Sequence, residues 1–354
     1  MKDKTKDILI IGAGLTGLAL AYYLKGKGFR ICILEGRNRT GGRILTVTNN
    51  ETPLEMGATW ISPQHTQLLG LIKELKLEIF EQKLGETAIY EPTANSPHQL
   101  VPLPQNQEPS YRIKGGSNML INSLEQQIET TDVVMGCLVI SINESEDFLK
   151  VNTNKGVFKT KHVISTLPPF LFHNTIKVSP SLPKEVHEVA QNTHTWMGES
   201  IKIGLSYSDA FWDEMKMSST VFSNQGPVTE MYDHSNFEQD RFALKGFLNN
   251  AYYSIAKEER IELIMRQLEK YYGPRVRNYL NYEELIWQHE TLTYKPYEGH
   301  LFPHQNNGHQ LYRNSFLKQR LYIAGTETAS AFPGYMEGAV RNAKEIASRL
   351  QKLQ

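Results

Sequence analysis

The sequence predicts an α/β protein of two domains whose segments alternate along the chain. First, 354 residues are more than one ordinary hydrophobic core holds. Second, residues 7–34 read as a strand, a glycine-rich turn, a helix and a second strand, which make one βαβ unit. Third, a buried strand at 320–324 and a helix at 336–350 lie at the other end of the chain. We therefore expect an α/β domain built from discontinuous segments, together with a smaller α+β domain.

The spacing of apolar residues predicts the elements in between. Amphipathic helices are expected at residues 66–77, 118–129 and 257–272. Strands are expected at residues 139–142, 162–166 and 200–207, and the last of these alternates strictly between apolar and other residues. The stretch 84–110 is rich in Pro, Asn, Gln and Thr, so it is expected to be irregular.

The composition excludes several classes of function. A formal net charge of +0 gives no global field for nucleic acid or an anionic membrane surface. No segment reaches the roughly 20 apolar residues that cross a bilayer, and the charged N-terminus has no apolar signal-peptide core. Cys32 and Cys137 are the only cysteines and make neither a disulfide framework nor a metal cluster. We expect a cytoplasmic protein without metal, nucleic-acid or membrane partners.

The glycine-rich turn predicts nucleotide binding. Gly12 allows a sharp turn after the strand, Gly14 allows a diphosphate to approach the backbone, and Gly17 allows close packing of the helix. The N-terminus of that helix offers free N–H groups to phosphates. Glu35 ends the next strand, where a carboxylate accepts hydrogen bonds from ribose hydroxyls. A purely structural turn would need neither three glycines nor the terminal carboxylate.

Two short motifs follow the nucleotide-binding unit. In Thr40-Gly41-Gly42-Arg43 the glycines permit close backbone approach, and Arg43 is either a phosphate ligand or a solvated surface residue. The small residues of Met56-Gly57-Ala58-Thr59 would let a flat ring system pack against the backbone.

A third motif lies near the C-terminus. The buried strand runs into Gly325, and a helix begins near Tyr335, after Gly334. The N-terminus of that helix either stabilises the negative charge of a reduced cofactor or simply packs closely through its glycines.

Lys202 lies on the strictly alternating strand. It shares one face with Gly204 and Ser206, and that face is either exposed to solvent or the wall of a cavity. The small size of the two neighbouring residues favours the cavity.

These motifs together resemble the flavin-containing amine oxidase family, whose members are monoamine oxidase-like. The resemblance rests on the N-terminal fingerprint with Gly41-Gly42-Arg43, and on Ala324-Gly325-Thr326-Glu327-Thr328 with Gly334-Tyr335-Met336-Glu337-Gly338-Ala339. The segments 114–117, 163–169 and 200–202 also match, so the resemblance covers nearly the whole chain in order. It implies a glutathione-reductase-like FAD-binding domain at residues 1–79, 104–190 and 290–354, with an interleaved substrate domain at 80–103 and 191–289.

The resemblance also implies roles for individual residues. Lys202 would hold a water at flavin N5, and Tyr335 would orient the substrate amine. The residues implied to bind FAD are Gly12, Gly14, Thr16, Gly17, Glu35, Arg37, Gly42, Arg43, Met56, Gly57, Ala58, Thr59, Val139, Trp287, Gly325, Glu327, Gly334, Tyr335, Met336 and Ala339.

The chain departs from the family pattern in three ways. Residues 297–303 contain no cysteine that could tether the flavin, so FAD is expected to be non-covalent. The second substrate-flanking aromatic falls at Leu301 in the substrate pocket, where Tyr297 or Phe302 could substitute for it. A long helical part of the substrate domain is missing, and only the proline-rich stretch 92–109 takes its place. The pocket is therefore expected to be more open, or covered by a second subunit of a homodimer.

The implied reaction removes hydride from the carbon next to an amine nitrogen of an amine or amino acid. Flavin N5 accepts the hydride, water hydrolyses the imine, and O2 reoxidises the flavin to give H2O2. Three alternatives stay open: a dehydrogenase, desaturase or isomerase for a larger apolar substrate, a flavin-binding protein without turnover, and an NAD-dependent dehydrogenase.

Overall fold

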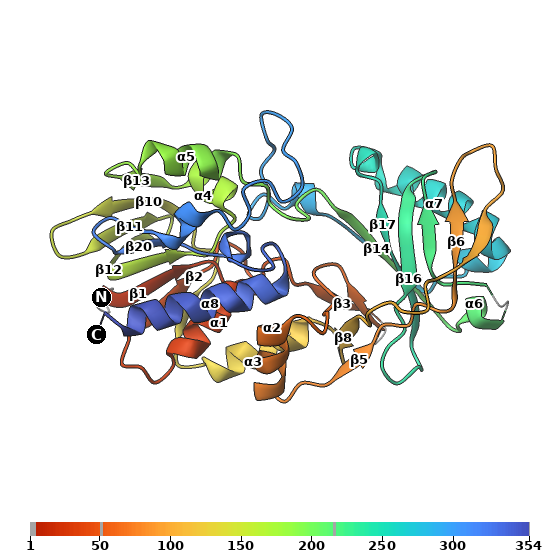
Figure 1. The fold of residues 1–354 in the computed structure, drawn as a ribbon, viewed down its shortest axis with the longest axis horizontal. Helices are drawn as coiled ribbons and strands as arrows, with labels where there is room; N and C mark the ends of the chain where they lie inside the picture. Colours follow the sequence, from red (N-terminus) through yellow and green to blue (C-terminus); the bar gives the residue numbers. More distant parts are fainter. Residues whose placement is uncertain (1–4, 50–51, 215–216, 354) are drawn as a thin grey trace.

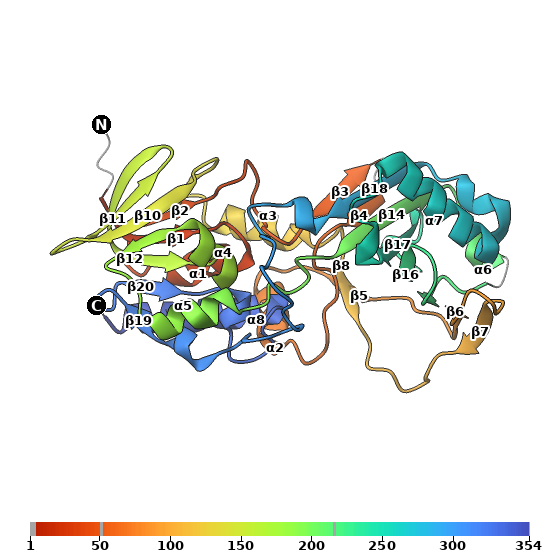
Figure 2. The same cartoon turned by 90° about the horizontal axis from the view of Figure 1, so that it is seen from above.

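The computed structural model describes residues 5–49, 52–214 and 217–353. The chain forms two lobes, each built on one large β-sheet (Figure 1). Both termini lie on the same lobe, so the N-terminal and C-terminal segments meet there (Figures 1 and 2). The mixed helix-and-sheet architecture confirms the predicted α/β class.

The first lobe contains a sheet of nine strands. The strand β1 (Thr5–Ile11) pairs in parallel with β2 (Ile31–Leu34) and with β12 (Gly156–Ser165). The far end of β12 also pairs in parallel with β20 (Leu321–Ile323), which brings the C-terminal strand beside the N-terminal unit. The remaining strands of this sheet are β9 (Asp132–Val134), β10 (Val139–Glu144), β11 (Leu149–Thr153), β13 (Lys177–Ser179) and β19 (Ser315–Phe316).

Helices cover both faces of the first sheet because its central strand is apolar on both sides. Ile8 and Ile10 pack in one hydrophobic core, and Leu9 and Ile11 pack in another. The first core includes α1 (Leu15–Leu24), α2 (Thr66–Glu74), α3 (Asn118–Gln127) and α8 (Met336–Gln351). The second includes α4 (Pro169–Thr175) and α5 (Lys184–Gln191), on the opposite side of the sheet from α8 (Figure 1).

The second lobe contains a sheet of seven strands. Their order is β18 (Asn281–Ile286), β14 (Ile201–Tyr207), β17 (Phe242–Leu248), β16 (Val228–Asp233), β15 (Val221–Ser223), β6 (Thr87–Glu91) and β7 (Gln99–Pro102). The helix α7 (Lys257–Tyr272) packs on one face of this sheet, and the short helix α6 (Phe211–Glu214) lies in the same core.

Two small ribbons lie between the lobes (Figure 2). One pairs β3 (Thr46–Asn49) with β4 (Thr52–Glu55), and the other pairs β5 (Ile79–Glu81) with β8 (Tyr111–Ile113). Leu54 and Met56 extend from the first ribbon onto the second sheet, where they pack against Ala243.

The helices and strands predicted from periodicity are present, but the prediction of an irregular stretch at 84–110 was wrong. Ala88 and Ile89 are fully buried, and Ile89 pairs in parallel with Val221. That long-range pairing overrides the turn-rich composition.

The domain boundaries remain a prediction. Among the described residues, no helix has both the length and the apolar character required to cross a bilayer.

Candidate active site

A cavity of about 600 Å³ is lined by residues of both lobes. Its walls come from the glycine turn after β1, the end of β12, the strands β14 and β17, and the start of α8. This volume lies within the range of roughly 300–1,000 Å³ that is usual for ligand-binding pockets.

The cavity brings together most of the residues predicted to form the site. Those that line it are Gly12, Gly14, Thr16, Glu35, Arg37, Gly42, Arg43, Gly57, Ala58, Thr59, Val139, Trp287, Gly334, Tyr335, Met336, Ala339 and Lys202. Those that do not line it are Gly17, Met56, Gly325, Glu327 and Leu301.

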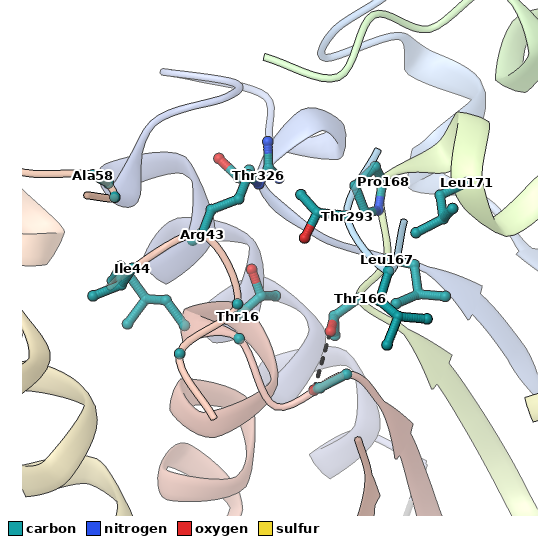
Figure 3. Close-up of a pocket in the computed structure, with 18 of the residues that line it drawn as sticks. Thr16, Arg43, Ile44, Ala58, Thr166, Leu167, Pro168, Leu171, Thr293 and Thr326 are labelled. Carbon is teal, nitrogen blue, oxygen red and sulfur yellow. Dashed lines mark hydrogen bonds between the residues drawn. The ribbon is translucent and has the colours of Figure 1, made fainter. Parts of the chain in front are cut away.

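The glycine turn forms a cradle of bare backbone. Gly14 caps the N-terminus of α1, and a Cβ on Gly14 would lie 3.8 Å from the Cα of Gly42. The first turn of α1 contains no acidic residue, and Thr16 in that turn faces the cavity. Thr166 lines the cavity as well (Figure 3), and its hydroxyl donates to the carbonyls of Ile11 (2.9 Å) and Gly12 (3.3 Å). Free N–H groups at a helix end without opposing carboxylates fit a diphosphate.

Gly17 and Gly325 act through packing. A Cβ on Gly17 would lie 2.1 Å from the carbonyl oxygen of Gly12, so α1 can approach β1 only with glycine there. Gly325 has φ +122°, and a Cβ there would lie 3.1 Å from the carbonyl oxygen of Thr166. Both residues therefore shape the cavity from behind its wall.

Glu35 lies at the adenosine-binding end expected for the motif. Its Oε2 accepts the N–H of Ala13 at 2.7 Å, and its Oε1 accepts the N–H of Arg37 at 2.9 Å. Each carboxylate oxygen keeps a further lone pair for a ribose hydroxyl. Arg37 itself is paired with Glu290 at 2.9 Å, and Val139 lines the same end of the cavity.

Arg43 differs from its predicted role as a phosphate cation. Its guanidinium forms a two-bond ion pair with the buried carboxylate of Glu327, at 2.5 and 2.9 Å, and donates to the carbonyl of Trp196 at 3.0 Å. A carboxylate with 0% side-chain exposure requires a partner charge, so Glu327 neutralises Arg43. The positive potential for a diphosphate therefore comes mainly from the start of α1.

Lys202 lies in the cavity wall, so the solvent-exposed alternative was wrong. Its Nζ donates to the carbonyl of Gly57, and its side chain is buried. Burial lowers the pKa of Lys202 to about 8, and the charge of Glu55 partly opposes that shift. Gly204, on the same strand face, packs against Leu54 and Met56.

Trp287 and Met56 form the support under this region. The indole N–H of Trp287 donates to the carbonyl of Met56 at 2.9 Å, and Trp287 lines the cavity. The side chain of Met56 instead joins the small core around Leu54.

The predicted aromatic partner of Tyr335 was wrong. Leu301 does not line the cavity, Phe302 is exposed, and the hydroxyl of Tyr297 is taken by the N–H of Thr195. Trp196 takes this place instead, with ring centroids 5.9 Å from Tyr335. His304 stacks on Trp196 at 3.8 Å and lies 5.9 Å from Tyr335. The only available sequence signal was an aromatic residue in the segment that leads into the Lys202 strand.

Sequence reasoning also missed three residues at the far end of the cavity. Glu230, Phe247 and Trp60 all line it. Glu230 pairs in register with Phe247, which pairs in register with Lys202, so the three side chains form a row on one sheet face. No motif in the sequence pointed to Glu230, and only the sheet order places it in this row.

The described residues bear on two other kinds of site, a metal site and a covalent tether for the flavin. They contain no group of three or more His, Cys, Asp or Glu side chains that could hold a metal ion. His300, the residue that comes nearest to the position of the family's tethering cysteine, is exposed and does not line the cavity. Cys137 lies near Glu35 and far along the chain from that position. Non-covalent attachment of the flavin stays a prediction.

Comparisons with known proteins identify the family of this chain. The family model "Flavin containing amine oxidoreductase" matches residues 15–104 and 98–351. A probable flavin-containing monoamine oxidase A of Dictyostelium discoideum is 23% identical, covering 97% of this chain and 98% of the relative. The flavin-containing amine oxidase B of Sus scrofa is 24% identical over 98% and 87% of the two chains. Both alignments, over 453 and 459 residues, are longer than this chain of 354, as expected for a short form.

Solved structures show the same fold. A putrescine oxidase bound to putrescine superposes with a TM-score of 0.85 at 22% identity, covering 98% of this chain and 99% of the other. The cyclohexylamine oxidase from Brevibacterium oxydans IH-35A gives a TM-score of 0.84 at 18% identity, with the same coverage. With the family model matching nearly the whole chain, the protein belongs to the flavin-containing amine oxidoreductase family and is an FAD-dependent oxidoreductase.

Proposed function

We propose that the protein oxidises the C–N bond of a small amine that carries a second cationic group, with O2 as the electron acceptor. FAD, when bound, supplies the redox chemistry by accepting a hydride from the carbon next to the nitrogen. The observation that carries the substrate class is the carboxylate of Glu230 in the same row of the cavity wall as Lys202.

The spacing of the sheet sets the length of such a substrate. Glu230 lies on β16 and Lys202 on β14, with β17 between them. Two inter-strand spacings put their backbones about 10 Å apart. The Phe247 ring lies between them, and Trp60 packs 5.8 Å from it, so the intervening wall is apolar. This arrangement suits an aliphatic chain with a cation near Glu230 and the reacting amine toward Lys202.

Glu230 is available to bind a cation. One oxygen of its carboxylate accepts the hydroxyl of Tyr232 at 2.8 Å, which fixes its position. Its other oxygen accepts no hydrogen bond from the described residues, and the side chain lines a cavity that a substrate ammonium can enter.

Other residues of the chain would orient the reacting end. The rings of Trp196 and Tyr335 are both at the cavity surface and would hold an amine through their faces. Lys202 would hold a proton, and through it a water, at the position beside the Gly57 carbonyl. The backbone around Gly14 would fix the diphosphate and so the position of the ring system.

The relatives support amine oxidation. Their names describe monoamine oxidases, a putrescine oxidase and a cyclohexylamine oxidase. A larger apolar substrate was favoured by Leu301 and by the missing helical segment, and of these two features Leu301 does not line the cavity.

An anaerobic reduction assay tests the function. Purified protein is mixed with monoamines, α,ω-diamines and amino acids while flavin absorbance is followed, and H2O2 is then measured in air. We expect diamines to bleach the flavin fastest and to release peroxide. If no amine bleaches the flavin, amine oxidation is disproved. If turnover occurs only with an artificial electron acceptor, O2 is not the acceptor.

The variant Glu230→Gln tests the substrate class. We expect a rise of at least tenfold in KM for diamines, with little change for monoamines. Glu298→Gln is the matched control, because Glu298 is exposed and outside the cavity. Equal effects of Glu230→Gln on both amine classes would contradict the role of Glu230. The predicted homodimer and cytoplasmic location are tested separately by light scattering and cell fractionation.

A further inference from the structure

A second lysine lies behind the cavity wall. Lys245 is on β17 and is fully buried, and its Nζ donates to the hydroxyl of Thr59, which lines the cavity. The Nζ of Lys245 also lies over the ring of Trp60, 4.7 Å from its centroid. Within the described ranges, no carboxylate forms an ion pair with Lys245. A buried lysine with only a neutral hydroxyl as its hydrogen-bond partner requires an explanation.

Hydrogen bonds connect Lys245 to Lys202. Lys245 bonds to the hydroxyl of Thr59, which donates to the carbonyl of Gly57 at 3.1 Å. The same carbonyl accepts the Nζ of Lys202. The two lysines are also diagonal neighbours on one sheet face, because Lys202 pairs with Phe247 and Gly204 pairs with Lys245. Lys202 is therefore linked to Lys245 through the Gly57 carbonyl and the Thr59 hydroxyl.

The charges around Lys245 favour its neutral form. Three charged groups change the pKa of Lys245: Lys202 on β14, Glu55 on β4 and Arg112 on β8. The charge of Lys245 in turn lowers the pKa of His234, which follows β16. Burial lowers the pKa of Lys245 well below its usual value, as does the charge of Lys202, and Glu55 opposes this shift. A buried amine with a lowered pKa is a base at neutral pH.

A small second pocket lies on the other side of this cluster. Glu55, Arg112 and His234 line it. The ring of His234 accepts the N–H of Glu55 at 3.4 Å through Nε2, and its Nδ1 lies 2.9 Å from Arg112. Lys245 therefore lies between two pockets. Thr59 separates it from the main cavity, and Glu55, Arg112 and His234 lie between it and the small pocket.

We propose that Lys245, acting through Thr59, accepts the proton that a substrate ammonium must lose before its C–N bond can be oxidised. The inference rests on the proposed amine oxidation. An ammonium has no lone pair with which to form an imine, so it must first become a neutral amine. The substrate N–H bond breaks, the hydroxyl of Thr59 takes that proton and gives its own to Lys245, and Lys245 becomes an ammonium. No electron is transferred in this step.

Lys202 is less suited to accept this proton. Its Nζ is directed to the Gly57 carbonyl as a donor, and the charge of Glu55 raises its pKa against the effect of burial. Lys245 is the lysine that is present as a neutral amine before the transfer, because burial and the charges of Lys202 and Arg112 disfavour its protonated form.

The pH dependence of kcat/KM tests the proton transfer, with the FAD-loaded enzyme and a diamine substrate. We expect Lys245→Met and Thr59→Val to move the acid limb toward the pKa of the substrate ammonium. At pH 7 both should lose at least tenfold in kcat/KM, and this loss should shrink at pH 10, where the substrate is already neutral. The matched control is Lys150→Met, because Lys150 is exposed on β11.

The cofactor-free protein gives a second readout. If Lys245 is neutral when folded, unfolding at pH 7–10 takes up a proton, so the wild type gains stability relative to Lys245→Met as pH rises. We expect the difference in Tm between these two proteins to shift in that direction, whereas the difference for Lys150→Met should stay constant.

Several results would overturn the inference. One is an unchanged pH profile in both variants, and another is a loss that is equal at every pH, which indicates a structural role. A constant difference in Tm would show that Lys245 is charged and is no base. If Lys245→Met fails to fold, Thr59→Val still tests the relay because it keeps the lysine. If no amine reduces the flavin of the wild type, the proposed function itself fails. If amines reduce that flavin but both variants keep the wild-type pH profile, only the role of Lys245 fails.

Discussion

Arg43 and Glu327 form a two-bond ion pair between residues 284 positions apart in the sequence. The pair joins the glycine motif that follows the first βαβ unit to the motif that follows β20. Arg43 also donates to the carbonyl of Trp196, so one guanidinium holds three segments of the cavity wall together. The N-terminal and C-terminal motifs are therefore coupled by direct contact.

Glu327→Gln should destabilise the protein strongly. Removing one charge of a buried pair leaves the other without compensation, which costs about 3–5 kcal/mol. Urea unfolding of the cofactor-free protein would measure the free energy, and released flavin would measure FAD content, which should also fall. The control is Glu188→Gln in the exposed pair with Lys184, where a loss below about 1 kcal/mol is expected. Equal losses in the two variants would contradict the structural role of the Arg43 pair.

Glycine substitutions should separate cofactor binding from folding. A methyl group on Gly14 meets only the Cα of Gly42 at 3.8 Å, so Gly14→Ala should keep the fold but obstruct the diphosphate. We expect FAD affinity to fall at least tenfold with almost unchanged Tm of the cofactor-free protein.

Gly17→Ala is the contrasting variant. Its methyl group would lie 2.1 Å from the carbonyl oxygen of Gly12, so α1 must move and Tm should fall before any cofactor is added. Calorimetry of the two cofactor-free proteins and titration with FAD would check both effects. A stable Gly17→Ala protein would show that α1 is free to shift.

The reaction with O2 should depend on the charge of Lys202. A positive group beside the reacting end stabilises the negative charge that O2 acquires on reduction. Because the pKa of Lys202 is lowered to about 8, this charge is present below pH 8 and is lost as pH rises through that value. Stopped-flow reoxidation should therefore slow above pH 8 in the wild type.

Lys202→Met should be slow at every pH, by at least tenfold at pH 7, while Lys150→Met should follow the wild type. Reoxidation that is fast and independent of pH in Lys202→Met would exclude this role.

Trp196→Ala should reduce kcat/KM for amines. It removes the ring that faces Tyr335 at 5.9 Å and also the stacking partner of His304 at 3.8 Å. We expect a loss of roughly tenfold, corresponding to about 1.4 kcal/mol of transition-state stabilisation. Leu301→Ala is the control, because Leu301 does not line the cavity. A larger loss of kcat/KM for Leu301→Ala would show that residue 301, as the family pattern suggested, contacts the substrate and that Trp196 does not.

Local sequence features determined the end of the cavity at which FAD binding is predicted. The strand, Gly12, Gly14, Gly17 and the terminal Glu35 lie within one βαβ unit, where backbone geometry follows from residues a few positions apart. The same is true of the C-terminal strand and helix. Alternation along 200–207 also identified a face of β14 that carries Lys202.

Tertiary structure alone decided the substrate end and the charge pairing. Trp196 lies beside Tyr335 although they are 139 positions apart in the sequence. Glu230 shares a row with Lys202 because β14, β17 and β16 are neighbours in one sheet. Lys245 reaches Thr59 because the segment after β4 lies beside that sheet. Arg43 looked like a phosphate ligand in sequence because its buried partner lies 284 residues away. A local pattern specifies backbone shape, whereas the partner of a long side chain depends on which distant segments pack against it.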